Sequence, residues 1–178
     1  MGKQYAKLTD LDIQFIKQQH LFFISSSSDK EVNLSPRGYD CLHIESNQKV
    51  FFYDYYGSGN RTKADIKADG EITMMFCSFS EKPKILRLFA VGEVISRVSE
   101  EFVPHMSNFK DVDVSLVRQV IVLHIYAVET SCGYAVPLME FKGHRSLLRQ
   151  GLEKIGSNDE IQNKFNKYPK RASLQNLS

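Results

Sequence analysis

Apolar residues recur with the two-residue period of β-strands over most of this chain, and helical spacing is confined to shorter stretches. Alternating or continuous apolar runs predict strands over residues 21–25, 32–34, 41–44, 50–55, 71–79, 84–98 and 117–130. Turn-forming residues at 26–30 and 45–48 predict that the first four strands form two hairpins. Both faces of the strand over 84–98 are mostly apolar, so we expect it to be covered on both sides.

Helix signals stand before, between and after these strands. They predict helices over residues 9–19, 60–69, 144–155 and 157–167, and a short helix from residue 99. Thr9 and Ser157 are placed as N-caps, and Gly70 stands where a helix-ending glycine belongs. The pattern therefore predicts a mainly β fold with helices (α+β), a six-stranded antiparallel β-barrel that carries C-terminal helices.

Size and composition fit one soluble domain with a helical appendage. The chain has 178 residues, 42% of them hydrophobic and 25% charged, and we expect a barrel domain over 1–140 and a helical extension and tail over 141–178. A net charge of +2 does not indicate a nucleic-acid surface, and there is no leader-like segment or membrane-spanning run. The three cysteines, Cys41, Cys77 and Cys132, are widely spaced and odd in number, which suggests reduced thiols in a cytoplasmic protein.

The segment from Tyr53 to Lys63 carries the clearest chemical signal. It leaves a strand, bends at two glycines and opens a helix with Asn60, Arg61, Thr62 and Lys63 at its first turn. Free backbone N–H groups, the positive end of the helix dipole, two cations and a hydroxyl would converge there, as a phosphate site requires. The alternative is a helix start that happens to be basic.

Other candidates also leave two interpretations open. Arg37 could be a turn residue with a surface ion pair, and Arg87, in the middle of a strand, needs either a polar ligand or an ion pair with Glu93 or Asp54. The five histidines show no metal-ligand spacing, so no metal is predicted. Cys132 as a nucleophile with His144 as its base is possible in principle, but it is the least supported of these candidates.

Five ordered motifs together resemble the pyridoxamine 5′-phosphate oxidase-related family, the FMN-binding split β-barrels. More narrowly, the chain is similar to a subgroup with an Asn-x-Ser-Pro-(Lys/Arg)-Gly pattern and an Asp-x-x-Gly-Ser-Gly-Asn-x-Thr pattern. The residues that carry this resemblance are 33–38, 54–62, 74–79, 85–88 and 131–137. It covers most of the chain, from the first helix to about Gly156.

The resemblance implies a homodimer with two FMN molecules at the subunit interface, and it supplies candidate ligands. Arg37, Arg61 and the pair Tyr53–Asp54 fall at the family's phosphate positions, with Asp in place of Thr. Arg87 falls where the family has a glutamine that reaches the isoalloxazine ring. The full set of candidate cofactor-binding residues is Ser35, Arg37, Tyr53, Asp54, Asn60, Arg61, Thr62, Lys63 and Arg87.

Departures from the oxidase proper limit the functional expectation. A second phosphate lysine of the oxidase falls on Leu42, and the chain has no tryptophan to take the place of the oxidase's C-terminal one. We therefore expect an FMN-dependent oxidoreductase of unknown substrate rather than a vitamin B6 oxidase. The alternatives are a non-catalytic flavin-binding module, such as a store or sensor, and a relative that takes a deazaflavin or haem.

Overall fold

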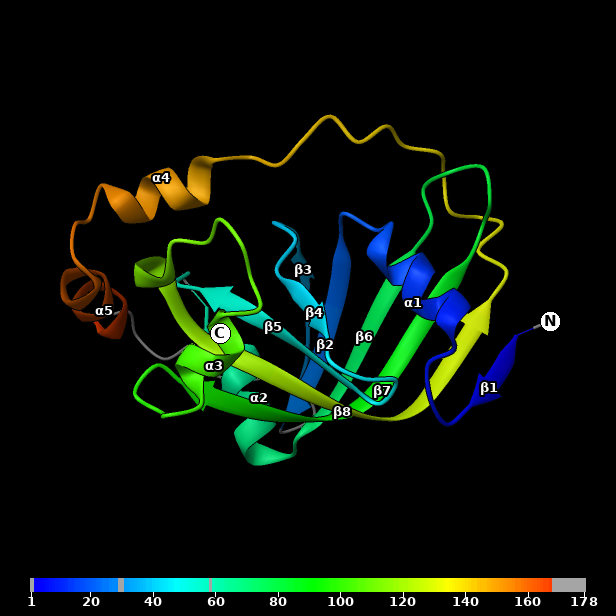
Figure 1. Cartoon of the computed structure of the whole chain (residues 1–178), viewed down its shortest axis with the longest axis horizontal. Coiled ribbons are helices and arrows are strands. Elements are labelled where there is room, and N and C mark those ends of the chain that lie inside the picture. The colour runs from blue at the N-terminus through cyan, green and yellow to red at the C-terminus, as the bar shows by residue number, and fades with distance from the viewer. Residues whose placement is uncertain (1, 29–30, 58, 168–178) are drawn as a thin grey trace, which may run out of the picture.

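A computed structural model of the chain describes residues 2–28, 31–57 and 59–167 (Figure 1). Its strands are β1 (Lys3–Tyr5), β2 (Phe22–Ser28), β3 (Glu31–Arg37), β4 (Leu42–Ile44), β5 (Lys49–Tyr55), β6 (Glu71–Cys77), β7 (Ile85–Ser96) and β8 (Val117–Ser131). Its helices are α1 (Asp10–Lys17), α2 (Arg61–Ala68), α3 (Phe102–Met106), the 3-10 turn η1 (Val114–Leu116), α4 (Leu147–Glu153) and α5 (Asn158–Asn166).

All the strands pair antiparallel in one sheet with the order β3-β2-β6-β7-β8-β5-β4, and β1 pairs with β8. This confirms the predicted mainly β class with helices and the two predicted hairpins, β2–β3 and β4–β5. The sheet has eight strands rather than six. Six of them are seven residues or longer, and the other two, β1 and β4, have three residues each. β1 left no signal in the sequence because it is short and largely exposed.

The core is built around β5, β7 and β8, which contribute fully buried side chains. Phe51, Phe52, Leu86, Leu88 and Ile121 are each at most 1% exposed. β5 and β8 are buried along both faces for much of their length, as expected of strands covered on both sides. Leu86, Leu88 and Ala90 of β7 are fully buried, while the alternate residues from Ile85 to Phe89 are partly covered. The expectation that this strand is covered on both sides along its length was wrong, because Val91 and Glu93 are exposed.

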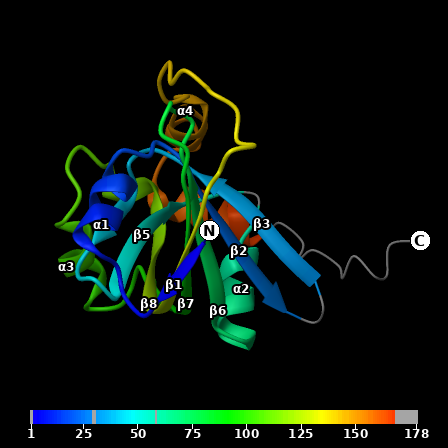
Figure 2. The same ribbon diagram turned by 90° about the vertical axis from the view of Figure 1, so that its right-hand side faces the viewer.

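The sheet is split between its two edges. Figure 2 shows β2 and β3 extending away from the rest of the barrel beside α2. In the described chain no backbone pairing joins β3 to β4 or β5. Instead, the side chain of Arg37 at the end of β3 contacts Asp54 of β5 across the gap, with 2.7 Å between Nη1 and Oδ1. The split therefore has polar walls.

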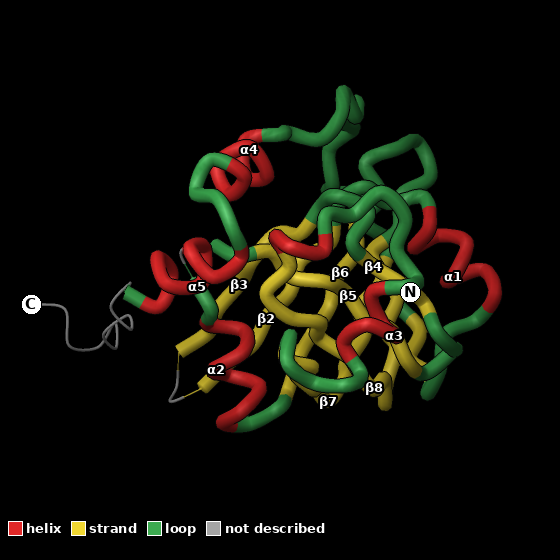
Figure 3. The backbone as a smooth tube through the Cα atoms, turned by 60° about the vertical axis from the view of Figure 1, so that its left-hand side comes forward, coloured by secondary structure: helices red, strands yellow, loops and turns green. Residues whose placement is uncertain are grey.

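Helix α2 lies on β2 and β7, where its N-terminus borders the split (Figure 3). Ile66 of α2 packs so closely on Gly92 of β7 that a Cβ at position 92 would lie 2.9 Å from its Cγ1. The helix ends as predicted, because Gly70 adopts φ +85° and its N–H bonds back to Asp65. Asp65 in turn accepts hydrogen bonds from Ser26 and Ser28 at 2.7 Å, which fastens the helix to β2.

After β8 the chain runs in an extended path across the top of the sheet to α4 and α5 (Figure 1). Both helices pack on the barrel, since Leu152 is 2% and Ile161 0% exposed. The predicted N-caps at Thr9 and Ser157 are confirmed, and each forms a capping box, Thr9 with Asp12 and Ser157 with Glu160. The division into 1–140 and 141–178 stays a prediction, and residues 168–178 lie outside the described part of the chain. Of the helices described, none has the length and apolar character needed to cross a membrane.

Candidate functional site

A cavity of about 370 Å³ occupies the split between β3, β5 and the start of α2. Seven of the nine candidate cofactor-binding residues line it, namely Ser35, Arg37, Tyr53, Asp54, Asn60, Arg61 and Thr62. Its volume falls in the range of small-molecule sites. The charged side chains in the lining are three arginines and one carboxylate, so the cavity carries an excess of positive charge.

Asp54 organises the floor of this cavity. Its side chain is 1% exposed and accepts from Arg37 at 2.7 Å, from Arg118 at 2.6 Å and from Gln119 at 2.9 Å. Gln119 also donates to Asn60 at 3.0 Å, which ties the mouth of α2 to the same network. One buried carboxylate thus holds two guanidinium groups side by side, a geometry suited to an anion with several oxygen atoms.

A β-bulge places Arg118 in this network. Asp54 pairs with Gln119 and Tyr55 pairs with Val117, so β8 has one extra residue, Arg118, opposite β5. Such a bulge re-aims a side chain that regular alternation would direct elsewhere. The Arg118 side chain is mostly covered at the cavity wall and also donates to the carbonyl of Gly59 at 3.1 Å.

Three buried polar atoms at this site lack a partner within the described chain. They are Nε of Arg37, Nε of Arg118 and Oε1 of Gln119. An unsatisfied buried polar atom costs roughly 1–3 kcal/mol, and proteins rarely leave several together. The two unsatisfied donors belong to arginines that line the cavity, and they fit a site that is completed by a polar ligand. Gln119 lies behind them, bonded to Asp54 and Asn60.

At the N-terminus of α2, the N-cap side chain does not cap the first-turn N–H groups. Asn60 occupies the N-cap position, yet its side chain makes no cap hydrogen bond, because its oxygen accepts from Gln119 instead. Thr62 is 4% exposed and its hydroxyl accepts from Asn33 at 3.2 Å. Among the residues that the structure describes, neither of these side chains caps the first turn, an arrangement that suits an anion at this helix start.

Arg61 already has carboxylate partners. Its Nη2 contacts Glu31 of β3, and its Nε lies 3.9 Å from Asp65 of its own helix. A guanidinium has five N–H donors, so these contacts leave donors for a ligand. The two acids reduce the local charge and hold Arg61 at the cavity wall.

Buried tyrosines and a thiol form the apolar side of the cavity. Burial strongly raises the pKa of Tyr53, and its hydroxyl donates to the carbonyl of Tyr39 at 3.0 Å. Burial also raises the pKa of Cys41 to about 12. Both side chains are therefore neutral near pH 7, and they add surface for stacking and shape rather than charge.

Two predicted residues, Lys63 and Arg87, lie outside the cavity lining. The pKa of Lys63 is lowered by burial and then by the nearby Lys67 and Arg118. Arg87 lies near the other end of β8, where its Nη1 contacts Glu129 at 3.2 Å and Ser131 at 3.0 Å. The predicted ion-pair partners of Arg87, Glu93 and Asp54, were wrong, because strand register opposes position 87 to position 129.

Sequence reasoning missed several members of the site. Arg118, Asn33, Tyr39, Gly59 and Leu148 line the cavity as well. Arg118 had one usable signal, a single cation at the start of an otherwise apolar strand. The contacts of His144 are with residues 20, 38, 39, 40 and 141, and they give no support to a pair with Cys132.

Comparison with known proteins points to one family. A search against family profiles finds no match. A curated relative, the pyridoxamine 5′-phosphate oxidase family protein ustO of Aspergillus flavus, is 34% identical over 140 residues. The aligned part covers 76% of this chain and 56% of the relative, so the chain spans about half the length of the curated relative that it matches.

Solved structures share the fold at low sequence identity. A proposed pyridoxamine 5′-phosphate oxidase from Lactobacillus delbrueckii aligns with a TM-score of 0.56 at 14% identity, covering 68% of this chain and 93% of that one. The protein HupZ from Group A Streptococcus gives 0.52 at 12%, with coverage of 68% and 92%. The FAD-binding protein of Mycobacterium smegmatis gives 0.51 at 8%, with coverage of 71% and 97%.

The sequence motifs, the split antiparallel sheet and these comparisons agree. The curated relative carries the family name, and the solved structures carry the same fold. The chain belongs to the pyridoxamine 5′-phosphate oxidase-related family.

Proposed function

We propose that the cavity between β3, β5 and α2 binds FMN, with the phosphate held by Arg37, Arg61, Arg118 and the N–H groups at the start of α2. The observation that carries the proposal is the pair of partly buried arginines on Asp54, whose buried Nε atoms have no partner within the described residues. Charge-assisted hydrogen bonds to a phosphate are about twice as strong as neutral ones. Thr62 and Ser35 add hydroxyl groups at the same wall.

We further propose that the protein is an FMN-dependent oxidoreductase. When bound, FMN would supply hydride-transfer chemistry, so the protein need not supply an acid or base of its own. The chain's residues would bind the phosphate, orient the ring and exclude water from it. The name of one structural relative, an FAD-binding protein, supports a flavin in this fold.

The competing cofactors can be compared by the ligands that the cavity lining provides. Haem needs an axial ligand such as His, Met, Tyr or thiolate. The lining of this cavity contains no His or Met in the described chain, and burial raises the pKa of Cys41, Tyr53 and Tyr55, which keeps these three protonated. Of the other two tyrosines in the lining, Tyr39 already donates its hydroxyl to the carbonyl of Arg145, and Tyr56 is buried. This disfavours haem at this site. A deazaflavin and a non-catalytic flavin store or sensor remain as competing proposals.

The proposed assembly is a homodimer with the flavin at the interface, in the cytoplasm. Exposed apolar side chains support a covered face: Val32 and Leu34 on β3 are 71% and 63% exposed, and Leu138 after β8 is 71% exposed. The three free cysteines support a reducing compartment. Light scattering would test the dimer, and a monomer at all concentrations would contradict it.

A cofactor panel tests the function. The apo protein would be titrated with FMN, riboflavin, a deazaflavin and haemin, and the visible spectrum would be followed after gel filtration. We expect FMN to be retained most strongly. Failure to retain FMN, while a flavin-binding relative retains it in parallel, would contradict the proposal. Mixing the FMN complex with NADH or NADPH then separates the enzyme from the store, because a store would show no flavin reduction.

A further inference from the structure

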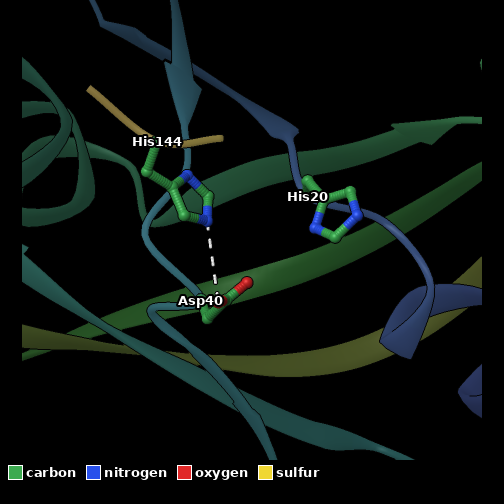
Figure 4. A group of neighbouring side chains, drawn as sticks. All are labelled: His20, Asp40 and His144. Atoms are coloured by element: carbon green, nitrogen blue, oxygen red, sulfur yellow. Dashed lines mark ion pairs between the residues drawn. The ribbon is translucent and has the colours of Figure 1, made fainter. Parts of the chain in front are cut away.

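Beside the proposed flavin site, three metal-ligating side chains meet from three distant parts of the chain (Figure 4). His20 precedes β2, Asp40 lies in the turn between β3 and β4, and His144 lies between β8 and α4. One ligand atom of each lies within 4.8 Å of the others. No short-range spacing in the sequence announces this cluster, because its ligands come together only in the fold.

We propose that His20, Asp40 and His144 bind one divalent transition-metal ion, for which zinc is the natural probe. Two imidazoles and one carboxylate match the ligand preference of zinc and its neighbours rather than that of calcium or magnesium, which favour oxygen ligands. Three protein ligands leave a fourth position for water.

The distance between two of the ligands supports a shared ion. His144 Nε2 lies 3.6 Å from Asp40 Oδ2, which is beyond a good hydrogen bond. Two ligand atoms on one tetrahedral zinc, each with a bond of about 2.0–2.2 Å, lie roughly 3.3–3.6 Å apart. The present separation matches that of two donors on a common metal, and the ligand atom of His20 lies within 4.8 Å of both.

Neighbouring contacts hold the ligands in place. The His20 ring stacks on Phe141 with centroids 3.7 Å apart and an interplanar angle of 10°. Tyr39 and Asp40 adopt the left-handed backbone region, with φ of 70° and 51°, which is unfavourable for residues other than glycine. Tyr39 offsets that cost through its hydroxyl, which donates to the carbonyl of Arg145. The strained turn presents Asp40 toward His144 (Figure 4).

Metal binding through Nε2 of His144 would break one hydrogen bond that the structure contains. The Tyr39 N–H donates to Nδ1 of His144 over 3.4 Å, whereas metal on Nε2 places the ring proton on Nδ1. The contact is long and exposed, so its loss costs little. A zinc ion held by three protein ligands stabilises the folded chain by much more than one hydrogen bond does. Metal binding would therefore prevail over this contact.

The site would act as a clamp on the segment that follows β8. His144 belongs to that segment, and Leu148, a few residues on, lines the proposed flavin cavity. Gly38 and Cys41, on either side of the ligand turn, line it as well. A metal at this position would fix the segment against the cavity mouth. The binding of the metal itself does not depend on the proposed flavin.

Zinc titration of tag-free, EDTA-treated protein tests the proposal, with a chromophoric chelator as competitor. We expect one zinc per chain and at least a tenfold weaker affinity in His144→Ala, His20→Ala and Asp40→Asn. Asparagine tolerates the left-handed backbone, so Asp40→Asn should keep the fold. His124→Ala is the matched control, because His124 is an exposed histidine beside a carboxylate, Glu93, outside the cluster.

A second measurement, limited proteolysis, tests whether the metal fixes the segment that follows β8. Zinc should slow proteolysis between residues 137 and 148 in the wild type and in His124→Ala, and should have no such effect in Asp40→Asn. Absence of stoichiometric zinc binding by the wild type would overturn the proposal. So would binding that survives all three ligand substitutions, or a loss in His124→Ala equal to that in His144→Ala.

Discussion

Asp54 Oδ2 lies 2.6 Å from Nη2 of Arg118, at a bulge where β8 carries one residue more than β5. The same carboxylate holds Arg37 from the opposite edge of the split sheet. The contact therefore does two things: it bridges the split, and it sets two guanidinium groups at one wall of the cavity. A network of this kind gives predictions for stability as well as for binding.

Asp54→Asn should destabilise the apo protein by about 3 kcal/mol, because loss of one partner from a buried ion pair leaves the other charges uncompensated. Urea denaturation followed by circular dichroism measures the change. Glu93→Gln, which alters an exposed pair with His124, should change stability by less than about 1 kcal/mol. An effect of Asp54→Asn as small as that of the control would show that the network is not a structural bridge.

The cysteines should differ in reactivity. Thiolate is the reactive form of cysteine, and burial raises the pKa of Cys41 to about 12 and raises that of Cys77 as well. Native protein treated with iodoacetamide at about pH 8 should therefore be alkylated first at Cys132, which is exposed. Mass spectrometry of the peptides gives the order. Labelling of Cys41 as fast as Cys132 would mean that the cavity wall opens readily.

Stability should depend on pH through Asp12. Burial acts to raise the pKa of Asp12, but hydrogen bonds from Lys84, Thr9 and Tyr5 outweigh it and lower the pKa below its ordinary value of 3.8. The ionised carboxylate thus stabilises the fold above about pH 4, and this contribution is lost as the pH falls through the lower, folded-state pKa. The stability difference between wild type and Asp12→Asn should be constant from about pH 5 to 7 and shrink below about pH 4. A difference that grows on acidification would contradict this.

Arg87 gives a prediction that depends on the dimer. It sits opposite Glu129, and residues 118 and 129 of β8 lie about 35 Å apart along the strand. Arg87 therefore lies far along β8 from the proposed phosphate site, and we expect it to reach the ring of a flavin held with a partner protomer. In that case Arg87→Gln should make the reduction potential of bound FMN more negative by about 20 mV, since a nearby cation favours reduced, anionic flavin. An unchanged potential would leave Arg87 as a surface partner of Glu129.

Local patterns predicted most of the fold but not all of the site. The strands follow from apolar alternation, and the helix ends at Thr9, Gly70 and Ser157 follow from side-chain caps and a glycine. The cavity residues of the Tyr53–Thr62 segment were predicted because they are close in sequence. Arg118 was missed because a bulge, which depends on strand register, turns it inward.

Contacts that form only in the tertiary structure could also not be predicted from the sequence. The partner of Arg87 depends on which residue of β8 lies opposite β7, and periodicity does not specify that register. The cluster of His20, Asp40 and His144 depends on where the segment after β8 crosses the barrel. Long extended segments carry no periodic signal that would place them.

The central claim is that Arg61 and its neighbours hold a flavin phosphate, and the affinities of FMN and riboflavin measure it most directly. Arg61→Ala should weaken FMN by about 10- to 150-fold, equivalent to roughly 1.5–3 kcal/mol for a charge-assisted bond, and should change riboflavin binding little. Lys67→Ala, in the last turn of the same helix and outside the cavity lining, should leave both affinities unchanged. Equal losses for FMN and riboflavin in Arg61→Ala would contradict the account.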